Sequence, residues 1–155
     1  MEPLPHHYRV ALEGQDGGQA SVSVDGIAPL RMAPPVQYGG PGNLWSPEHL
    51  LLAAVEACFL FTLRAVAKAS GIELLDVRAE ASGVLDRCEG VTRFTEIVLR
   101  PRITVAAGAD RARIERALVK AERNCLISAS LSTPVHLESV VTEAHEAPTP
   151  RTEAA

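Results

Sequence analysis

The stretch SPEHLLLAAVEACFLFTLRAVAKA, residues 46–69, decides the fold that the sequence predicts. Ser46 offers a hydroxyl to the free amides of a helix start, and Pro47 suits the first helical position. Ser70 and Gly71 supply a stop, so we expect one helix of about 35 Å. Its middle is apolar nearly all round, which is typical of a helix buried on more than one side. A domain of this size cannot surround such a helix alone, so we expect burial against a second copy of the chain.

Composition restricts the class of protein. The chain has 155 residues, which fits one domain, and a formal net charge of -4. Without a basic cluster, neither a nucleic acid nor a membrane surface is an expected partner. The most apolar run, residues 50–63, contains Glu56 and is shorter than the ~20 residues that span a bilayer. The start resembles no signal peptide and the cysteines number three, so we expect a cytoplasmic protein with reduced thiols.

Alternating apolar and polar residues predict strands on both sides of this helix. Turn-forming residues at 14–18 and 86–90 join two pairs of strands as hairpins. Pro101 predicts an edge or a bulge in the strand that contains it. A loop rich in Pro and Gly spans residues 33–44. The predicted strands are residues 8–13, 20–25, 27–32, 76–85, 92–105 and 134–142.

A second predicted helix opens at Asp110 and carries a single apolar stripe. The stripe has the spacing i, i+3, i+4, i+7 and i+11, which indicates an amphipathic helix. Its members are Ile114, Ala117, Leu118, Ala121 and Cys125. Strands interrupted by two helices indicate an α+β domain, which we place at residues 1–142. Residues 143–155 mix charge with Pro, Thr and Ala and are predicted to be a disordered tail.

Two cysteines lie in distinctive segments. Taken singly, each fits a small buried apolar residue. Residues 46–58, SPEHLLLAAVEAC, resemble the Pro-Glu-(x)-Leu-Leu-Ala-Ala stretch that leads into the first cysteine of the OsmC/Ohr family. Residues 121–128, AERNCLIS, resemble the second cysteine motif of that family, Ala/Glu-x-x-Cys-x-x-Ser. The separation of 67 positions between Cys58 and Cys125 is also similar.

The resemblance implies an OsmC-like fold, an intertwined α+β homodimer with antiparallel sheets around two long central helices. It also implies a thiol-dependent peroxidase that reduces organic hydroperoxides in the oxidative stress response. Cys58 would attack the peroxide as a thiolate and become a sulfenic acid, and Cys125 would condense with it to form a disulfide. A dithiol reductant, of lipoyl type in the Ohr branch, would reopen the disulfide. No cofactor is implied.

Activation of Cys58 is the point where the sequence departs from the family pattern. Cys58 lies far from the N-terminus of its own helix, and apolar burial raises the pKa of a thiol. The family uses an arginine of the N-terminal hairpin, held by the glutamate that Glu48 matches. Here Gln15 occupies the arginine's place; it can donate a hydrogen bond but carries no charge. Arg9 and Arg31 flank the hairpin and are the candidate substitutes.

Structural explanations compete with some of these roles. Glu48 also suits the first turn of a helix, where the dipole favours a carboxylate. Phe59 and Phe61 would wall a pocket for an alkyl hydroperoxide or pack in a core, and Trp45 would cover its mouth or fill an interface. Glu56 is a carboxylate that needs a partner, and we expect an ion pair across the dimer.

Two functions stay open at this point. One is the peroxidase; the alternative is an OsmC-like dimer with weak or no peroxidase activity that binds a small lipophilic ligand. A cation beside Cys58 despite Gln15 would favour the enzyme. Cys88, in a polar turn with acidic neighbours, is expected to be an incidental surface thiol. His6 and His7 have no partners at ligand spacing, so we assign no metal.

Overall fold

The computed structural model describes residues 2–15 and 17–144 of the chain. The chain divides into two compact units, Met1–Leu51 and Leu52–Ala155, each described by itself. The last described strand ends at Glu143, one residue past the predicted domain boundary. The remainder of the predicted tail, from residue 145 onward, lies outside the described residues.

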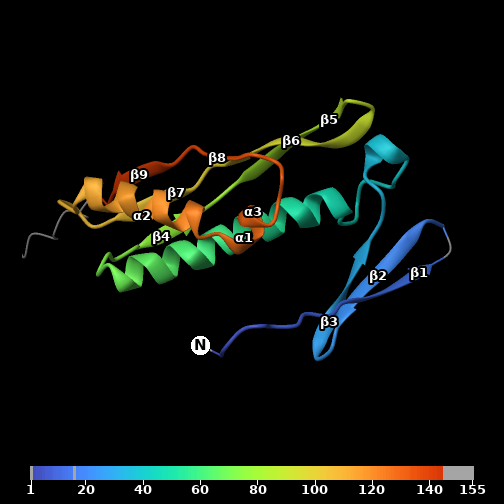
Figure 1. Cartoon of the computed structure of the whole chain (residues 1–155), viewed down its shortest axis with the longest axis horizontal. Helices are drawn as coiled ribbons and strands as arrows, with labels where there is room; N and C mark the ends of the chain where they lie inside the picture. The colour runs from blue at the N-terminus through green and yellow to red at the C-terminus, as the bar shows by residue number, and fades with distance from the viewer. Residues whose placement is uncertain (1, 16, 145–155) are drawn as a thin grey trace, which may run out of the picture. The chain divides into compact units, whose positions relative to one another are not determined.

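The N-terminal unit contains a three-stranded antiparallel sheet in the order β1-β2-β3 (Figure 1). Gly17 and Gly18 have φ values of 80° and 75° in the turn after β1, a conformation that glycine adopts without strain. The predicted hairpin and third strand are confirmed, although the first strand is shifted toward the turn. A short 3-10 helix, η1, lies in the predicted loop. The bounds are β1 Ala11–Gln15, β2 Gln19–Val24, β3 Ile27–Met32 and η1 Val36–Tyr38.

The helix α1, Pro47–Ala69, is confirmed with the predicted ends. The Ser46 hydroxyl accepts a hydrogen bond from the amide of His49 at 3.3 Å, which is the expected cap. At the other end Gly71 adopts a φ of 62°, so the chain leaves the helix there. The long predicted helix is therefore specified at both ends by local sequence.

The C-terminal unit carries two three-stranded sheets, ordered β4-β7-β9 and β5-β6-β8. Each long predicted strand is two strands here. Pro101 breaks the second run, and Glu80 and Arg100 exchange backbone hydrogen bonds across the break. The bounds are β4 Asp76–Arg78, β5 Ala81–Cys88, β6 Val91–Leu99, β7 Arg102–Val105, β8 Val135–Leu137 and β9 Val140–Glu143.

The expected α+β fold with antiparallel sheets is confirmed, and two of the sheets also contain a parallel pairing. Strand β8 pairs with β6, and β9 pairs with β7, both in parallel. The reason is that the chain passes through α2 and α3 between β7 and β8, and this crossover returns it in the direction of its partners. The single predicted strand 134–142 is divided accordingly, with one half in each sheet.

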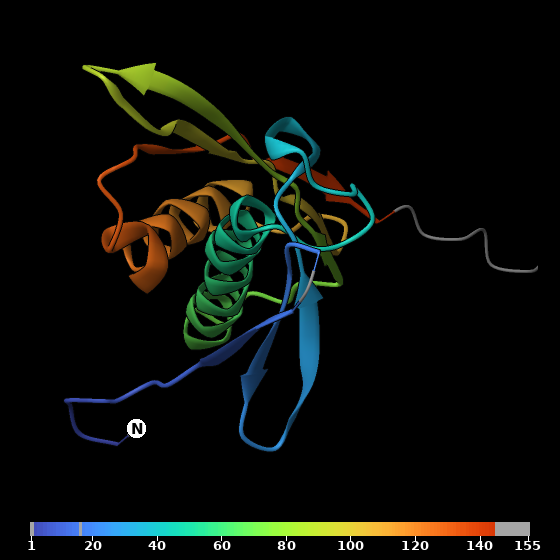
Figure 2. The ribbon, with the colours of Figure 1, turned by 90° about the vertical axis from the view of Figure 1, so that its right-hand side faces the viewer.

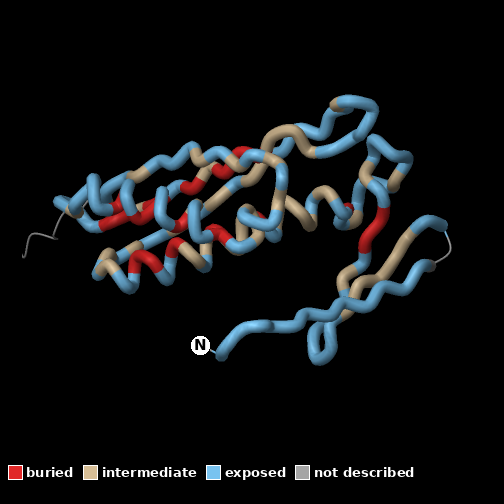
Figure 3. Tube along the Cα trace, in the orientation of Figure 1, coloured by how far each residue is buried: buried red, intermediate tan, exposed pale blue. Residues whose placement is uncertain are grey.

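The helix α2, Arg111–Arg123, lies beside α1 in the C-terminal unit (Figures 1 and 2). Asp110 caps it by accepting a hydrogen bond from the Arg113 amide at 3.0 Å. All the predicted stripe residues are buried, and all of them except Ala117 belong to one core with residues of α1 and the strands (Figure 3). A short helix α3, Leu126–Ala129, follows directly. The core members with zero exposure are Val55, Phe59, Ile97, Leu99, Ile103, Ala121 and Cys125.

By length and composition alone, α1 is also long and apolar enough to cross a membrane. Its most apolar 18-residue window has a mean hydropathy of 2.0, and 22% of that window is buried. The helix has 23 residues, so the expectation that the apolar run is too short was wrong on length. Core helices of globular proteins satisfy the same criterion. What α1 does show is an apolar surface that one chain leaves largely uncovered.

Candidate thiol site in the C-terminal unit

Cys58 and Cys125 are brought together in the C-terminal unit. Cys58 lies on α1 and is half-buried, whereas Cys125 has zero exposure and immediately precedes α3. Both are free thiols, and their side chains interact directly. The 66 intervening residues bring the chain back to α1, so two thiols that are distant in sequence become neighbours.

Packing between α1 and α2 sets the position of Cys125. The buried stripe of α2 holds the end of that helix in the core. From there the Cys125 thiol donates a long hydrogen bond, 3.9 Å, to the carbonyl oxygen of Val55. Val55 lies three residues before Cys58, almost one turn of the same helix. This contact fixes Cys125 beside the α1 turn that carries Cys58.

The pKa of the Cys58 thiol is lowered from its ordinary value. Burial acts in the opposite direction and is the largest single influence, because it disfavours the thiolate. It is outweighed by the backbone amides of Ile127 and Leu126 and by the side chains of Cys125 and Thr62, all of which favour the thiolate. The hydrogen-bond donors that counteract the effect of burial on the pKa of Cys58 therefore all lie within the C-terminal unit.

The pKa of the Cys125 thiol is raised. Burial is the main cause, and the neighbouring Cys58 adds to it; the hydroxyl and amide of Ser128 act the other way. The Ser128 hydroxyl is itself buried, without another hydrogen-bond partner. The two thiols are thus unequal: Cys58 has the lowered pKa, and Cys125 keeps a proton that can turn from the Val55 carbonyl oxygen to the Cys58 thiolate.

Sequence reasoning had missed the groups that favour the Cys58 thiolate. The first amides of a helix point outward unpaired and favour a negative charge. The amides that favour the Cys58 thiolate belong to α3 and not to the helix that contains Cys58. The positions of two hydroxyl side chains could have been predicted from helical spacing. Thr62 follows Cys58 by four residues, and Ser128 follows Cys125 by three residues.

Glu48 belongs to the N-terminal unit and lies in the first turn of α1. It lines an apolar pocket of about 320 Å³ together with Leu12, Ala20, Met32 and Tyr38. Its Oε2 atom is buried and has no hydrogen-bond partner among the described residues. A buried carboxylate oxygen in that condition favours a cationic or hydrogen-donating partner.

The two arginines that the sequence offered as activating cations for Cys58 lie in the N-terminal unit, and both are exposed. Arg31 is exposed and donates a hydrogen bond of 2.6 Å to the side chain of Gln19. Arg9 is exposed just before β1. Gln15 ends β1, where its backbone pairs with Gln19; its side chain lies outside the described part of the chain. Activation of Cys58 by any of the three stays a prediction.

Of the three residues expected to line a substrate pocket, one is buried in the core and two are exposed. Phe59 has zero exposure and packs in the core, so it lines no open pocket of this chain. Phe61 is 64% exposed on α1, and Trp45 is 47% exposed, with its ring edge-on to His49 at 6.5 Å between ring centroids. Of the three, Phe61 and Trp45 stay available to a ligand or a partner.

Two further residues singled out in the sequence are Cys88 and Glu56. Cys88 is the last residue of β5 rather than a turn residue, and it is half-buried. The pKa of Glu56 is raised by burial first and by the nearby Glu80 carboxylate second. Within the described residues, no cluster of three or more His, Cys, Asp or Glu side chains could hold a metal ion.

Comparison with known proteins shows the family of the chain. A family model described as OsmC-like protein matches residues 40–140, a range that includes both thiols and all of α1 and α2. This chain belongs to the OsmC-like family. An uncharacterised protein of Bacillus subtilis (strain 168), YmaD, is 32% identical over 107 residues, covering 67% of this chain and 71% of YmaD.

Solved structures of OsmC-like proteins have the same fold. An OsmC-like protein of unknown function from Vibrio cholerae superposes with a TM-score of 0.81 at 18% identity, covering 88% of this chain and all of the other. An organic hydroperoxide resistance protein, OsmC, from Legionella pneumophila superposes with a TM-score of 0.70 at 26% identity, covering 89% and 99%. The family of this OsmC-like protein therefore includes organic hydroperoxide resistance proteins, which suggests a role in peroxide resistance.

Proposed function

We propose that this OsmC-like protein is a thiol-dependent peroxidase that reduces organic hydroperoxides, with Cys58 as the attacking thiol and Cys125 as the resolving thiol. The observation that carries the proposal is the unequal thiol pair, in which Cys58 has a lowered pKa and Cys125 a raised one. A nucleophile needs the thiolate, and a resolving thiol can wait in the protonated form.

The first step forms an S–O bond and breaks the O–O bond of the peroxide. The Cys58 thiolate attacks the terminal oxygen and becomes a sulfenic acid, while the other oxygen takes up a proton from the solvent and leaves as the alcohol. Cys58 loses two electrons and the peroxide gains them. The amides of Leu126 and Ile127 face the sulfur and favour its negative charge before attack.

In the second step the Cys125 sulfur attacks the Cys58 sulfenic acid, forming the disulfide and releasing water. The contact between the two side chains supports this step. An external dithiol then returns two electrons and two protons, becoming a disulfide itself. A dithiol of lipoyl type is the reductant that the family resemblance suggests.

In this proposal the active protein is a homodimer. Exposed apolar side chains on α1, Phe61 above all, support it, because one chain leaves them in water. In the dimer the partner's surface would complete the pocket for the alkyl group. The unpartnered Oε2 of Glu48 supports a role for this carboxylate in binding a cationic group.

The decisive experiment adds one equivalent of cumene hydroperoxide to the reduced protein and follows intact mass and free-thiol count. We expect rapid loss of two thiols in the wild type and no disulfide in Cys58→Ser or Cys125→Ser. Trapping with dimedone should label Cys58 in the Cys125→Ser variant, and Cys88→Ser is the matched control that leaves the reaction unchanged. Thiols that stay reduced for many minutes in the wild type would overturn the proposal.

A second candidate function rests on the apolar pocket of the N-terminal unit. A volume of about 320 Å³ is at the lower end of the range for small-molecule sites. If the thiols prove inert, the alternative is a binding protein for a small lipophilic ligand. Tyr38→Ala, which removes a wall of this pocket, should then weaken binding of a fluorescent fatty-acid probe, whereas the peroxidase proposal predicts no such dependence.

A further inference from the structure

Positive charge is concentrated on α2. The helix carries five basic and two acidic side chains, a net charge of +3 within a chain of net charge -4. The remainder of the chain therefore carries -7. Such segregation places a local positive potential on an otherwise acidic protein.

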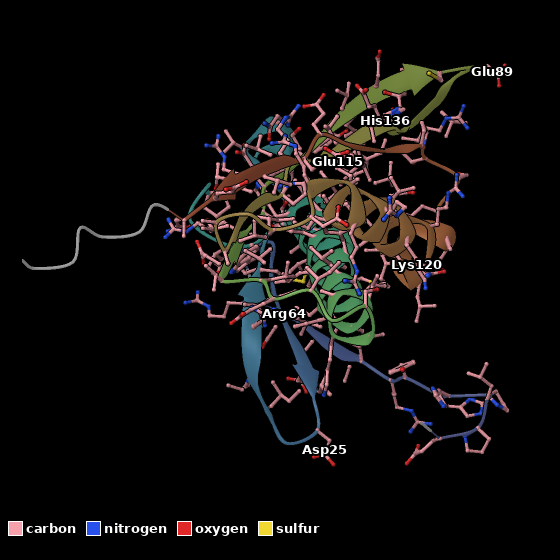
Figure 4. All side chains as sticks on the ribbon, turned by 90° about the vertical axis from the view of Figure 1, so that its left-hand side faces the viewer. Asp25, Arg64, Glu89, Glu115, Lys120 and His136 are labelled. Carbon is pink, nitrogen blue, oxygen red and sulfur yellow. The ribbon has the colours of Figure 1, made fainter. Side chains whose placement is uncertain are left out.

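Three of these cations form one exposed face. Arg116, Lys120 and Arg123 have the spacing i, i+4, i+7, so they line one side of the helix, opposite the buried stripe. Val119, 47% exposed, lies between them. Together with Ala112, Glu115 and Asn124, these residues line a shallow hollow of about 610 Å³. We call Arg116, Val119, Lys120 and Arg123 the α2 cationic face; Figure 4 labels Lys120 on it.

The other basic residues of α2 have partners inside the chain. Arg111 pairs with Glu115 at 3.2 Å, and Arg113 donates a hydrogen bond to the carbonyl oxygen of Ser70. Among the described residues, none of the three cations of the face forms an ion pair. Lys120 and Arg123 gain from the helix dipole in the last turn, but Arg116, in the middle of the helix, does not.

The α2 cationic face leads to the thiol site. Arg123 ends α2, and Cys125 follows two residues later. A molecule seated on the face would therefore end beside the segment that holds the resolving thiol and the amides facing Cys58. Leu126, 76% exposed, extends the apolar part of this surface in the same direction.

We propose that the α2 cationic face docks an acidic protein surface that carries the dithiol reductant. This inference rests on the proposed peroxidase function. Docking brings the dithiol to the Cys58–Cys125 disulfide, which it reopens by transferring two electrons and two protons while its own sulfurs form a disulfide. Long-range attraction raises the rate of encounter, and Val119 and Leu126 supply a small apolar contact.

A protein fits this face better than a nucleic acid does. Among the described residues, the face has three cations that form no ion pair, Glu115 and Glu122 lie on one flank of it, and the rest of the chain is acidic. A long polyanion would meet repulsion beyond the helix, whereas a compact acidic patch meets the cations alone.

The test uses the full-length protein, oxidised to its disulfide, and two synthetic peptides that each carry one dihydrolipoyl group. One peptide is rich in Asp and Glu, and the other has Asn and Gln at the same positions. The readout is the ratio of the two second-order rates of disulfide reduction, measured at low and high salt. We compare wild type with Arg116→Glu/Lys120→Glu/Arg123→Glu. The matched control, Arg78→Glu/Arg87→Glu/Arg93→Glu, changes the total charge equally on exposed strand residues.

We expect the acidic peptide to react about tenfold faster with the wild type at low salt, and the advantage to fall as salt rises. The ratio of the rate with the acidic peptide to the rate with the neutral peptide should drop to one or below in the α2 triple variant. In the strand control it should stay at the wild-type value. Equal rates for both peptides in the wild type, or equal losses in both triple variants, would overturn the docking proposal. Failure of the wild type to form a disulfide at all would instead overturn the proposed function.

Discussion

Cys58 shows how polar hydrogens can lower the pKa of a half-buried thiol. Its pKa is lowered because amides of α3 and two side chains outweigh the penalty of burial. A lower pKa means a larger thiolate fraction at neutral pH, so Cys58 should alkylate faster than Cys125. We expect the rate of iodoacetamide modification, followed by peptide mass spectrometry, to reach half its plateau at a lower pH for Cys58 than for Cys125. Cys125→Ala removes one donor and should slow Cys58 at pH 7 roughly threefold; an unchanged profile would show that Cys125 does not donate to the thiolate.

Glu56 gives a second prediction at the scale of one residue. Burial and Glu80 raise its pKa, so the folded state is penalised when this carboxyl ionises. The penalty is absent below the unfolded pKa of about 4.3 and develops as pH rises through the folded value. Glu56→Gln should therefore stabilise the protein at pH 7, by roughly 0.5 kcal/mol or less given solvent screening, and leave it unchanged at pH 4. Destabilisation at pH 7 in thermal unfolding would instead support the predicted ion pair across the dimer.

Capping decides where the elements begin. Asp110 accepts the Arg113 amide at the start of α2, as its sequence position predicted. Asp110→Ala should cost about 1 kcal/mol, or about 3 °C in Tm, whereas Asp110→Asn keeps an acceptor and should cost much less. Differential scanning calorimetry of the two variants separates the cap from the loss of charge; equal losses would assign the effect to charge.

Tight packing between elements gives a prediction that the sequence does not contain. A Cβ on Gly83 in β5 would lie 2.8 Å from the Phe94 ring and 3.0 Å from the Leu52 side chain. Gly83→Ala should therefore destabilise the protein by about 1–3 kcal/mol. Gly14→Ala in β1, where a Cβ meets nothing within 4 Å, is the matched control. Similar unfolding midpoints in urea for both variants would contradict the close packing.

At the scale of the whole molecule, the exposed apolar side of α1 predicts self-association. Analytical ultracentrifugation should give twice the 16.5 kDa of one chain. Phe61→Glu places a charge on the exposed apolar side chain of α1 and should shift the equilibrium toward monomer, because burying an unpaired charge is costly. Val91→Glu, at the similarly exposed start of β6, should not do so. A monomeric wild type would remove the dimer from the proposal.

The sequence by itself determined the features that depend on local chemistry. Ser46 and Asp110 as caps, the hairpin turns, the buried stripe of α2 and the two cysteine motifs were all readable, because each depends on neighbours within a turn or two. The family followed from the same motifs. Only the tertiary structure decided that β8 and β9 pair in parallel, that Phe59 is core, and that α3 turns its first amides toward Cys58. Those outcomes depend on contacts between residues far apart along the chain, and the pKa of a thiol responds to whatever polar hydrogens folding brings beside it, wherever they lie in the sequence.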